Sequence, residues 1–345
     1  MKHETYMSAN IRAFAAPAKG AKLQPFEFDP GPLREDQVEI QVAYCGICHS
    51  DLSMIDNEWG RSVYPLVPGH EVVGTITAVG AQVNHLRPGQ TAGLGWFSGS
   101  CLVCPQCLGG NHNLCPNAES TIVGRHGGFA NRVRGQAVWA MALPEGVPPA
   151  TAGPLFCGGI TVFNPIIQFG VQPTDRVGVI GIGGLGHLAL QFLNKWGCEV
   201  VAFTSSDSKH AEAMKLGAHV AINSRDPAQL KAVAGSLNFV ISTVNVGLDW
   251  GLYLNVLAPK GRLHFVGAAL TPLGIMPVEL LDGQKSLSGS PLGSPATVMK
   301  MLAFCARHQI APVTENFPLS RVNEALEHLR AGQARYRIVL HNDLK

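Results

Sequence analysis

The feature that most constrains this chain is a glycine-rich turn between a buried strand and a helical pattern. The motif GIGGLG, residues 181–186, follows an apolar run at residues 176–182, and apolar residues then recur at helical spacing as far as Trp196. In that setting the first glycine permits a tight turn, the second lets the backbone approach a pyrophosphate, and the third lets helix and strand pack closely. The N–H groups at the start of the helix then face the anion. A turn without a ligand is the alternative interpretation.

Strands and helices continue to alternate beyond this motif. Strand patterns lie at residues 199–204, 220–223, 238–244 and 262–267, and helical patterns lie at residues 208–216, 227–234 and 249–257. This alternation predicts right-handed β-α-β units and a parallel sheet covered on both faces. The fold class is therefore α/β, and residues 159–302 are expected to form a doubly wound, Rossmann-type domain.

The rest of the chain has a different pattern, and its length of 345 residues suits two domains. Residues 10 to about 155 contain short β-type runs, such as residues 38–44, separated by glycine and proline. Helical patterns at residues 296–307 and 322–330 precede a last strand at residues 336–340. We expect residues 1–158 and about 303–345 to form an irregular, mostly antiparallel β domain to which the last strand returns.

Four closely spaced cysteines predict a structural metal site. Their spacing is Cys101-x2-Cys104-x2-Cys107-x7-Cys115, inside a loop expected over residues 99–117. Zinc prefers a tetrahedron of soft ligands, and a full set of thiolates leaves no position open for a substrate. Disulfides are the alternative, which a reducing compartment disfavours. The loop contains no Lys or Arg, which argues against a zinc ribbon that binds nucleic acid.

A second, dispersed group of side chains predicts a catalytic metal site. It comprises CGICHSD at residues 45–51, GHE at residues 69–71 and CGG at residues 157–159. Two thiolates and one imidazole leave one coordination position open, as a catalytic zinc requires. Spacing alone does not select the ligands from the candidates Cys45, Cys48, His49, His70 and Glu71.

The end of the strand at residues 199–204 indicates which nicotinamide cofactor the chain takes. A carboxylate there would bond the ribose 2′-hydroxyl of NAD, whereas hydroxyls and a cation favour the 2′-phosphate of NADP. We expect NADP, and NAD is the alternative if Asp207 points at the ribose. The residues expected at the 2′-phosphate are Thr204, Ser205, Ser206 and Lys209.

The composition excludes several classes of partner. Lys+Arg 26 against Asp+Glu 24 gives a formal net charge of +2, which provides no field to attract a nucleic acid or an anionic membrane. No apolar stretch approaches the roughly 18 residues of a membrane-spanning helix, and the first ten residues lack the apolar core of a signal peptide. We expect a cytoplasmic protein that acts on a small molecule.

Together these motifs resemble those of the zinc-dependent medium-chain dehydrogenases. Within that family they are most similar to the cinnamyl-alcohol-dehydrogenase branch and its bacterial, NADPH-dependent aldehyde reductases. The segments CGICHSDL, YPLVPGHEVVG, GPLFCGGITVF, GVIGIGGLGHLAL and ARYRIVL occur in the family order along nearly the whole chain. The resemblance implies a GroES-like catalytic domain, a Rossmann domain and a homodimer, with a tetramer as the alternative.

The resemblance also implies roles for residues of the dispersed group. Cys48, His70 and Cys157 would bind the catalytic zinc, with Glu71 close to the metal and Cys45 outside the ligand set. Asp51 would orient the imidazole ligand.

Other roles concern the substrate and the proton. Ser50 would hydrogen-bond the substrate oxygen, and His49 would lie near the cofactor pyrophosphate. Ser53 stands where many relatives have the histidine that ends the proton relay, so His49 or solvent would complete the relay. Trp96 and Trp59 would line the substrate channel, although Trp96 is also consistent with an ordinary core aromatic.

Cofactor residues are assigned over a longer stretch. Thr161 would lie under the nicotinamide, and the glycine turn would hold the pyrophosphate. The remaining cofactor-binding residues expected are Gly181, Gly183, Gly184, Leu185, Gly186, Val244 and Gly267.

The implied reaction is reversible hydride transfer from NADPH to an aldehyde, giving a primary alcohol, on an enzyme with one catalytic and one structural zinc per chain. An alcohol or polyol dehydrogenase that works oxidatively, possibly with NAD, is the first alternative. A catalytically silent binding protein is the second, which the complete set of presumed ligands and Ser50 disfavours.

Overall fold

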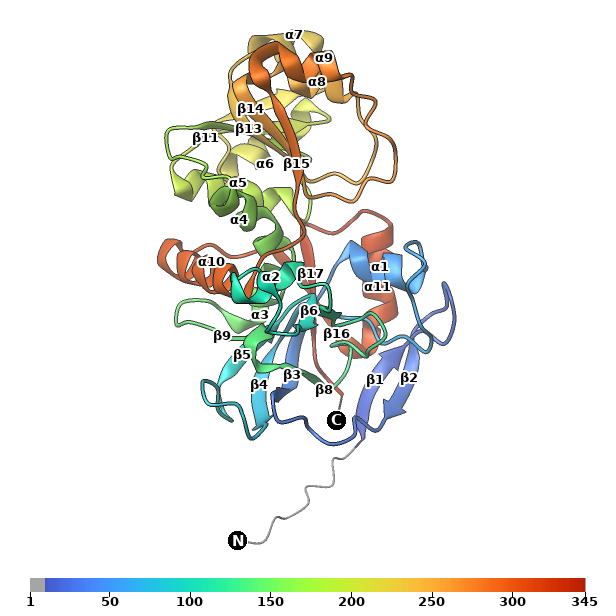
Figure 1. Cartoon of the computed structure of the whole chain (residues 1–345). Coiled ribbons are helices and arrows are strands. Elements are labelled where there is room, and N and C mark those ends of the chain that lie inside the picture. Colours follow the sequence, from blue (N-terminus) through green and yellow to red (C-terminus); the bar gives the residue numbers. More distant parts are fainter. Residues whose placement is uncertain (1–9, 345) are drawn as a thin grey trace, which may run out of the picture. The chain divides into compact units, whose positions relative to one another are not determined.

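The computed structural model describes residues 10–344, which divide into two compact units (Figure 1). Unit 2 is Gly158–Gly293, and unit 1 contains the residues before and after it. The sequence analysis placed the second boundary near residue 302. The structure instead assigns helix α10 (Pro295–His308) to unit 1, because this helix packs against strand β9 (Ala140–Ala142).

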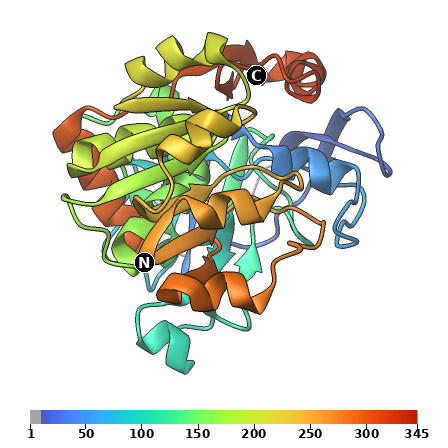
Figure 2. The same ribbon diagram turned by 90° about the horizontal axis from the view of Figure 1, so that it is seen from above.

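Unit 2 is built on one parallel sheet in the order β12-β11-β10-β13-β14-β15. This is the doubly wound order, with the first strand of the unit in the middle and the chain reversing direction beside it. Figures 1 and 2 show helices on both faces of the sheet. The strands are β10 (Arg176–Ile180), β11 (Glu199–Thr204), β12 (Val220–Asn223), β13 (Leu237–Ser242), β14 (Leu257–Phe265) and β15 (Ser286–Gly289). The predicted α/β class and Rossmann topology are confirmed.

The helices of unit 2 are α4 (Gly158–Gln168), α5 (Gly186–Trp196), α6 (His210–Lys215), α7 (Pro227–Ala232), α8 (Trp250–Asn255) and α9 (Pro277–Leu281). Four of them, α5 to α8, lie where the sequence pattern predicted helices. Helices α4 and α9 and strand β15 were not predicted. Helix α4 is a largely apolar run that contains Pro165, α9 has only five residues, and β15 is a short serine-rich segment. The core contains Val201, Phe203 and Val240 between sheet and helices.

Unit 1 is built on a mostly antiparallel sheet in the order β16-β17-β3-β4-β5-β9, with β8 also paired to β3. The last strand, β17, pairs with β3, so the end of the chain returns to the first part of the molecule as the sequence predicted. The main strands are β3 (Gln37–Ile47), β4 (Val72–Val79), β5 (Thr91–Leu94), β8 (Arg132–Gln136), β16 (Thr314–Pro318) and β17 (Arg337–His341). Two smaller sheets pair β1 (Ile11–Ala15) with β2 (Gln24–Phe28) and β6 (Phe97–Gly99) with β7 (Glu119–Ser120).

The helices of unit 1 are short apart from α10 and α11 (Val322–Arg330), and the others are α1 (His49–Ile55), α2 (Pro105–Leu108) and α3 (Pro149–Ala152). Helices α1 and α11 lie side by side (Figure 1), and Arg330 pairs with Asp56 at 2.7 Å just beyond α1. Within residues 10–344 no single helix is long and apolar enough to cross a membrane, although the consecutive segments Pro149–Phe156 and Gly158–Gln168 pass that test as a bent pair.

Candidate active site

Three chain segments of unit 1 meet beside the paired ends of β3 and β4. Cys45 of β3 lies opposite Val72 of β4, so the residues just after β3 are close to those just before β4. Gly153 packs closely against the residue just before β4: a Cβ atom added at Gly153 would lie 2.6 Å from the Glu71 carbonyl oxygen. The short helix Gly153–Phe156 then delivers Cys157 to the same place.

Four buried side chains from these segments can hold a metal ion. The ligand atoms of Cys48, His70, Glu71 and Cys157 all lie within 4.8 Å of one another. The two sulfur atoms of Cys48 and Cys157 are 3.9 Å apart. The structure therefore brings together the three side chains that the resemblance implies as catalytic ligands, with Glu71 beside them.

Asp51 fixes the orientation of His70. Its Oδ1 atom lies 3.0 Å from Nδ1 of the imidazole and also accepts the Gly69 N–H at 2.8 Å. The carboxylate accepts, so Nδ1 carries the proton and the lone pair is on Nε2. His70 Nε2 is buried and has no hydrogen-bond partner among residues 10–344. An unpartnered imidazole nitrogen directed at two thiols is what a metal ligand requires, so these residues fit a zinc ion.

The electrostatics of this group favour a bound cation. A hydrogen bond from the Cys157 thiol, helped by His70 and Arg337, lowers the pKa of Cys48 well below its usual range. The same hydrogen bond and burial raise the pKa of Cys157. Burial disfavours the imidazolium of His70, but the Asp51 carboxylate outweighs it and raises the pKa of His70, so a metal ion on Nε2 would take the place of a proton. A buried thiolate needs a compensating positive charge, which a divalent cation supplies.

Arg337 of β17 is a site residue that the sequence analysis missed. Its Nη2 atom pairs with Glu71 Oε1 and donates to the Ile47 carbonyl at 3.2 Å, and both side chains of the pair are almost completely buried. Burial raises the pKa of Glu71 while Arg337 opposes the shift. The other carboxylate oxygen, Oε2, has no partner in the described part of the chain. The only sequence signal was an arginine inside the otherwise apolar last strand.

Two further candidates of the dispersed group lie outside this cluster. Cys45 is buried, but its thiol donates to the Gly46 carbonyl at 3.6 Å and burial raises its pKa. His49 is the exposed first residue of α1.

The two serines of α1 have different surroundings. Ser50 Oγ lies 3.6 Å from the Cys48 sulfur, next to the cluster. Ser53 is buried, and its hydroxyl donates to Glu58 Oε2 at 2.6 Å. Because Glu58 is exposed, the outer serine is connected to a carboxylate in contact with solvent.

Two tryptophans extend outward from the imidazole ligand. The Trp96 ring is 5.0 Å from the His70 ring at 83°, and Trp59 is 5.9 Å from Trp96 at 70°. Both tryptophans are half-buried. They therefore provide apolar ring surface beside the metal cluster, and both rings also pack against the core of unit 1.

The second predicted metal group is also assembled. The sulfur atoms of Cys101, Cys104, Cys107 and Cys115 lie within 4.8 Å of one another on the loop that contains α2. Backbone N–H groups of Val103 and Cys104 lower the pKa of Cys101 to about 6, whereas burial raises that of Cys107 to about 12. All nine cysteines, which lie within the described residues, are free thiols.

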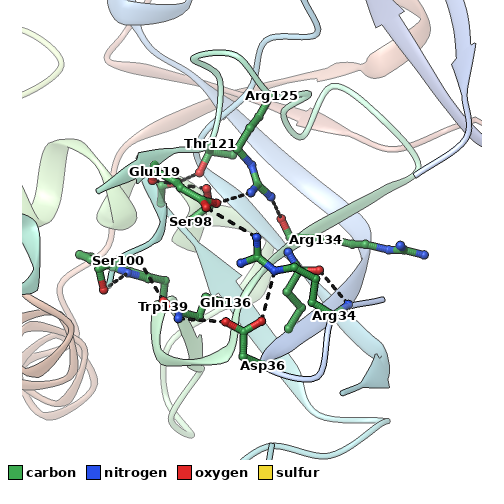
Figure 3. A network of polar contacts seen from close by, with 12 residues as sticks. Arg34, Asp36, Ser98, Ser100, Glu119, Thr121, Arg125, Arg134, Gln136 and Trp139 are labelled. Carbon is green, nitrogen blue, oxygen red and sulfur yellow. Dashed lines mark hydrogen bonds and ion pairs between the residues drawn. The ribbon is translucent and has the colours of Figure 1, made fainter. Parts of the chain in front are cut away.

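A polar network anchors the ends of this loop to the rest of unit 1 (Figure 3). Glu119, just after the loop, accepts from Arg125 at 2.5 Å, and Ser100, next to the first of the four cysteines, accepts from Trp139 at 3.2 Å. Gln136 of β8 accepts the Ser100 N–H at 3.0 Å and donates to Asp36. None of these contacts involves the four thiols. A metal ion bound by the thiols would therefore order the loop itself, whereas the polar network holds the ends of the loop against the rest of unit 1.

The glycine turn of unit 2 has the geometry that its sequence predicted. Gly181 has φ +85°, and a Cβ atom at Gly186 would lie 1.9 Å from the Gly181 carbonyl, so the first and third glycines are required for turn and packing. A Cβ atom at Gly183 would meet no atom within 4 Å. This open space at the start of α5, which has no side-chain cap, fits a pyrophosphate.

The other expected cofactor residues of unit 2 fall into two groups. Val244 and Gly267 pack next to the turn, since a Cβ atom at Gly267 would lie 2.0 Å from the Val244 carbonyl and one at Gly181 would lie 2.4 Å from the Val244 side chain. Thr161 is buried in α4. Gly184 and Leu185 complete the turn before α5.

The segment after β11 carries several hydroxyl groups and one exposed carboxylate, that of Asp207. Ser206 and Ser208 hydrogen-bond each other at 2.9 Å, and Thr204 Oγ1 donates to the Ser206 carbonyl at 2.9 Å. Asp207, whose carboxylate would favour NAD, lies 3.5 Å from His210 Nε2. The Asp207 side chain is 69% exposed, and this contact is longer than those between the hydroxyl groups.

Comparisons with known proteins agree with this geometry. The chain matches the family models of the alcohol dehydrogenase GroES-like domain over residues 34–145 and the zinc-binding dehydrogenase over residues 184–307. It is 57% identical over 330 residues to the aldehyde reductase AdhA of Synechocystis, covering 96% of this chain and 98% of that protein. It is 39% identical over 336 residues to a probable cinnamyl alcohol dehydrogenase of Oryza sativa, covering 95% and 94%.

Solved structures with a similar fold include two cinnamyl alcohol dehydrogenases. The enzyme from Sorghum bicolor has a TM-score of 0.92 at 36% identity, and the enzyme from Helicobacter pylori, complexed with NADP(H), has a TM-score of 0.89 at 27% identity. Each covers 96% of this chain and 98% of its own. The chain therefore belongs to the zinc-dependent medium-chain alcohol dehydrogenases, in the cinnamyl-alcohol-dehydrogenase-like branch, and is an oxidoreductase.

Proposed function

We propose that this enzyme reduces aldehydes to primary alcohols with NADPH, reversibly. The observation that carries the proposal is the buried cluster of Cys48, Cys157 and His70, with the imidazole Nε2 atom unpartnered and directed at the two thiols. The 57% identity to an aldehyde reductase over nearly the whole chain supports the direction and the substrate class.

Two zinc ions per chain fit the residues present. Cys48, His70 and Cys157 would hold the catalytic ion with one position open, and the four cysteines of the loop would hold the structural ion. When bound, the catalytic zinc supplies a Lewis acid for a carbonyl oxygen and the reduced nicotinamide supplies the hydride. Glu71 is kept in place by Arg337, and its second carboxylate oxygen, Oε2, is buried without a partner among residues 10–344.

The chain's own groups would handle the proton. Ser50 is the hydroxyl nearest the cluster and would hydrogen-bond the substrate oxygen. Ser53 lies one helical turn further along α1 and donates to Glu58, so a proton on this side can pass to a carboxylate at the surface. Glu58 would thereby replace the relay histidine of many relatives, beside His49 at the start of the helix.

The cofactor is NADPH in this proposal. Gly181, Gly183 and Gly186 would receive the pyrophosphate, and Thr204, Ser205, Ser206 and Lys209 would surround the 2′-phosphate. NAD is the alternative if the Asp207 carboxylate, which is 69% exposed and 3.5 Å from His210 Nε2, points at the ribose. The relative of known structure from Helicobacter pylori is described with NADP(H).

The substrate is a flat or aliphatic aldehyde in this proposal. The T-shaped contacts from His70 to Trp96 and from Trp96 to Trp59 offer apolar ring faces beside the cluster. Few polar groups on this surface would satisfy the hydroxyls of a polyol.

The enzyme would act as a cytoplasmic homodimer. All nine cysteines are free thiols, which suits a reducing compartment. The parallel sheet ends at the short edge strand β15, and exposed apolar side chains lie just before it at Leu270, Met276, Val278 and Leu281. An exposed edge with an apolar patch is typical of a surface that pairs with a second copy.

Steady-state kinetics test the proposal. A series of aromatic and aliphatic aldehydes, with polyols for the reverse reaction, is assayed with NADPH and with NADH on enzyme of measured zinc content. We expect the highest kcat/KM for an aldehyde with NADPH. A higher kcat/KM for a polyol with NAD would instead indicate an oxidative sugar dehydrogenase, and no turnover with any pair would indicate a silent member of the family.

A further inference from the structure

The ends of β11 and β12 form one continuous polar surface, only half of which the proposed function uses. The two strands are parallel neighbours, with Thr204 opposite Asn223, so the residues after both strands lie at the same edge of the sheet. Nucleotides bind at this carboxyl edge in doubly wound folds. Residues following β12 are therefore placed beside those expected at the 2′-phosphate.

Ser224 ties the two strand ends together. Its backbone N–H and its hydroxyl both donate to the Thr204 carbonyl, each at 2.8 Å. The next residue, Arg225, has its N–H held by the Asn223 side chain at 3.1 Å. The backbone on which the arginine stands is thus fixed relative to the end of β11.

The charges around Arg225 leave its guanidinium available. Its neighbour Asp226 caps helix α7 by accepting the Ala228 N–H at 2.9 Å, and it also accepts from Gln229 at 3.0 Å. Asp207 of the facing segment is exposed and lies 3.5 Å from His210 Nε2, and no ion pair in the described part of the chain joins it to Arg225. Within residues 10–344 neither Arg225 nor Lys209 forms an ion pair, and both are exposed.

We propose that Arg225 is a specificity-determining residue that binds the phosphate monoester on the ribose 2′ position of the cofactor. This inference rests on the proposed use of NADPH and extends its binding site to a second strand. A phosphate monoester carries close to two negative charges, which one lysine does not balance. A guanidinium presents two parallel N–H donors to two phosphate oxygens and adds the second positive charge.

Fragment binding tests this inference without turnover. Zinc-loaded enzyme is titrated calorimetrically with 2′,5′-ADP, which carries the 2′-phosphate, and with 5′-AMP, which lacks it. The variants are Arg225→Ala, Arg225→Gln and, as a matched control, Lys231→Ala. Lys231 is an exposed cation in the last turn of helix α7, which begins shortly after Arg225. Its removal changes the net charge by the same amount as the removal of Arg225.

We expect the native enzyme to bind 2′,5′-ADP more tightly than 5′-AMP. Loss of charged hydrogen bonds in either Arg225 variant should weaken 2′,5′-ADP at least about tenfold and leave 5′-AMP within about twofold. The Lys231 variant should bind both fragments like the native enzyme.

The titrations distinguish a failure of the proposed role of Arg225 from a failure of the proposed cofactor. If the Arg225 variants keep the native preference for 2′,5′-ADP, or lose affinity for both fragments equally, the role of Arg225 is refuted while the use of NADPH stands. If the native enzyme itself does not distinguish the fragments, the proposed cofactor is refuted and the inference falls with it.

Discussion

The ion pair between Arg337 and Glu71 provides a sharp test of how the active-site cluster is held. Only 4% of the Arg337 side chain and none of the Glu71 side chain is exposed. Removing one partner of such a pair strands a buried charge, which typically costs 3–5 kcal/mol. We expect about 3 kcal/mol for Arg337→Met in the zinc-loaded enzyme, at the lower end of that range, because the nearby metal offsets part of the stranded charge.

The assay is urea unfolding of the zinc-loaded enzyme at fixed metal concentration. A loss of about 3 kcal/mol should lower the midpoint by up to about 1 M, because the urea m-value rises with protein size to about 3 kcal/mol per M or more. Arg321→Met is the matched control, since Arg321 pairs with Glu324 at 2.5 Å but both side chains are more than half exposed. That change should cost less than about 1 kcal/mol.

A second variant separates the stranded charge from lost packing. Adding Glu71→Gln to Arg337→Met removes the uncompensated carboxylate, so the double variant should recover a large part of the lost stability. If Arg337→Met destabilises the enzyme no more than Arg321→Met does, the reasoning from burial is wrong.

The other predictions concern the two metal groups and a buried histidine. Cys48→Ser should abolish aldehyde reduction and lower the zinc content by one ion per chain. Cys45→Ser, at a buried thiol outside the cluster, should keep both the activity and the zinc content. If both variants lost activity and zinc to the same extent, the proposed ligand set would be contradicted. Cys104→Ser should lose the other zinc and lower the thermal midpoint by several degrees, and an unchanged midpoint would contradict a structural role. Burial lowers the pKa of His264 to about 4, so the unfolded state binds the extra proton between that pH and about 6.5. The free energy of unfolding should therefore rise with pH across this window, by at most about 3 kcal/mol from this residue. In the variant His264→Gln the free energy of unfolding should depend less steeply on pH. An equally steep dependence in the variant would show that His264 is not responsible.

The sequence predicted those parts of the fold whose pattern is local. Alternating strands and helices from residue 176 onward gave the parallel sheet, because each strand there is a short apolar run followed by turn residues. Helix α4 was missed because Pro165 interrupts a largely apolar and mostly buried run. The boundary near residue 302 was misplaced because the contact of α10 with β9 is long-range and leaves no mark in either segment.

The candidate site shows the same limit. Motifs singled out Cys48, His70 and Cys157, although these residues are up to 109 positions apart, because each lies in a short family segment. Arg337 left no comparable signal, since its contact with Glu71 depends on β17 pairing with β3 across the chain. The hydrogen bond from Ser53 to Glu58 was also not predicted, because it depends on how the chain turns after α1.

Anomalous diffraction at the zinc absorption edge, on crystals of the native enzyme, tests the central claim most directly. We predict a peak about 2.3 Å from the sulfur atoms of Cys48 and Cys157 and about 2.0 Å from Nε2 of His70, in addition to one among the four loop cysteines. A crystal with a peak only at the loop, or with the first zinc bound through other side chains, would contradict the account.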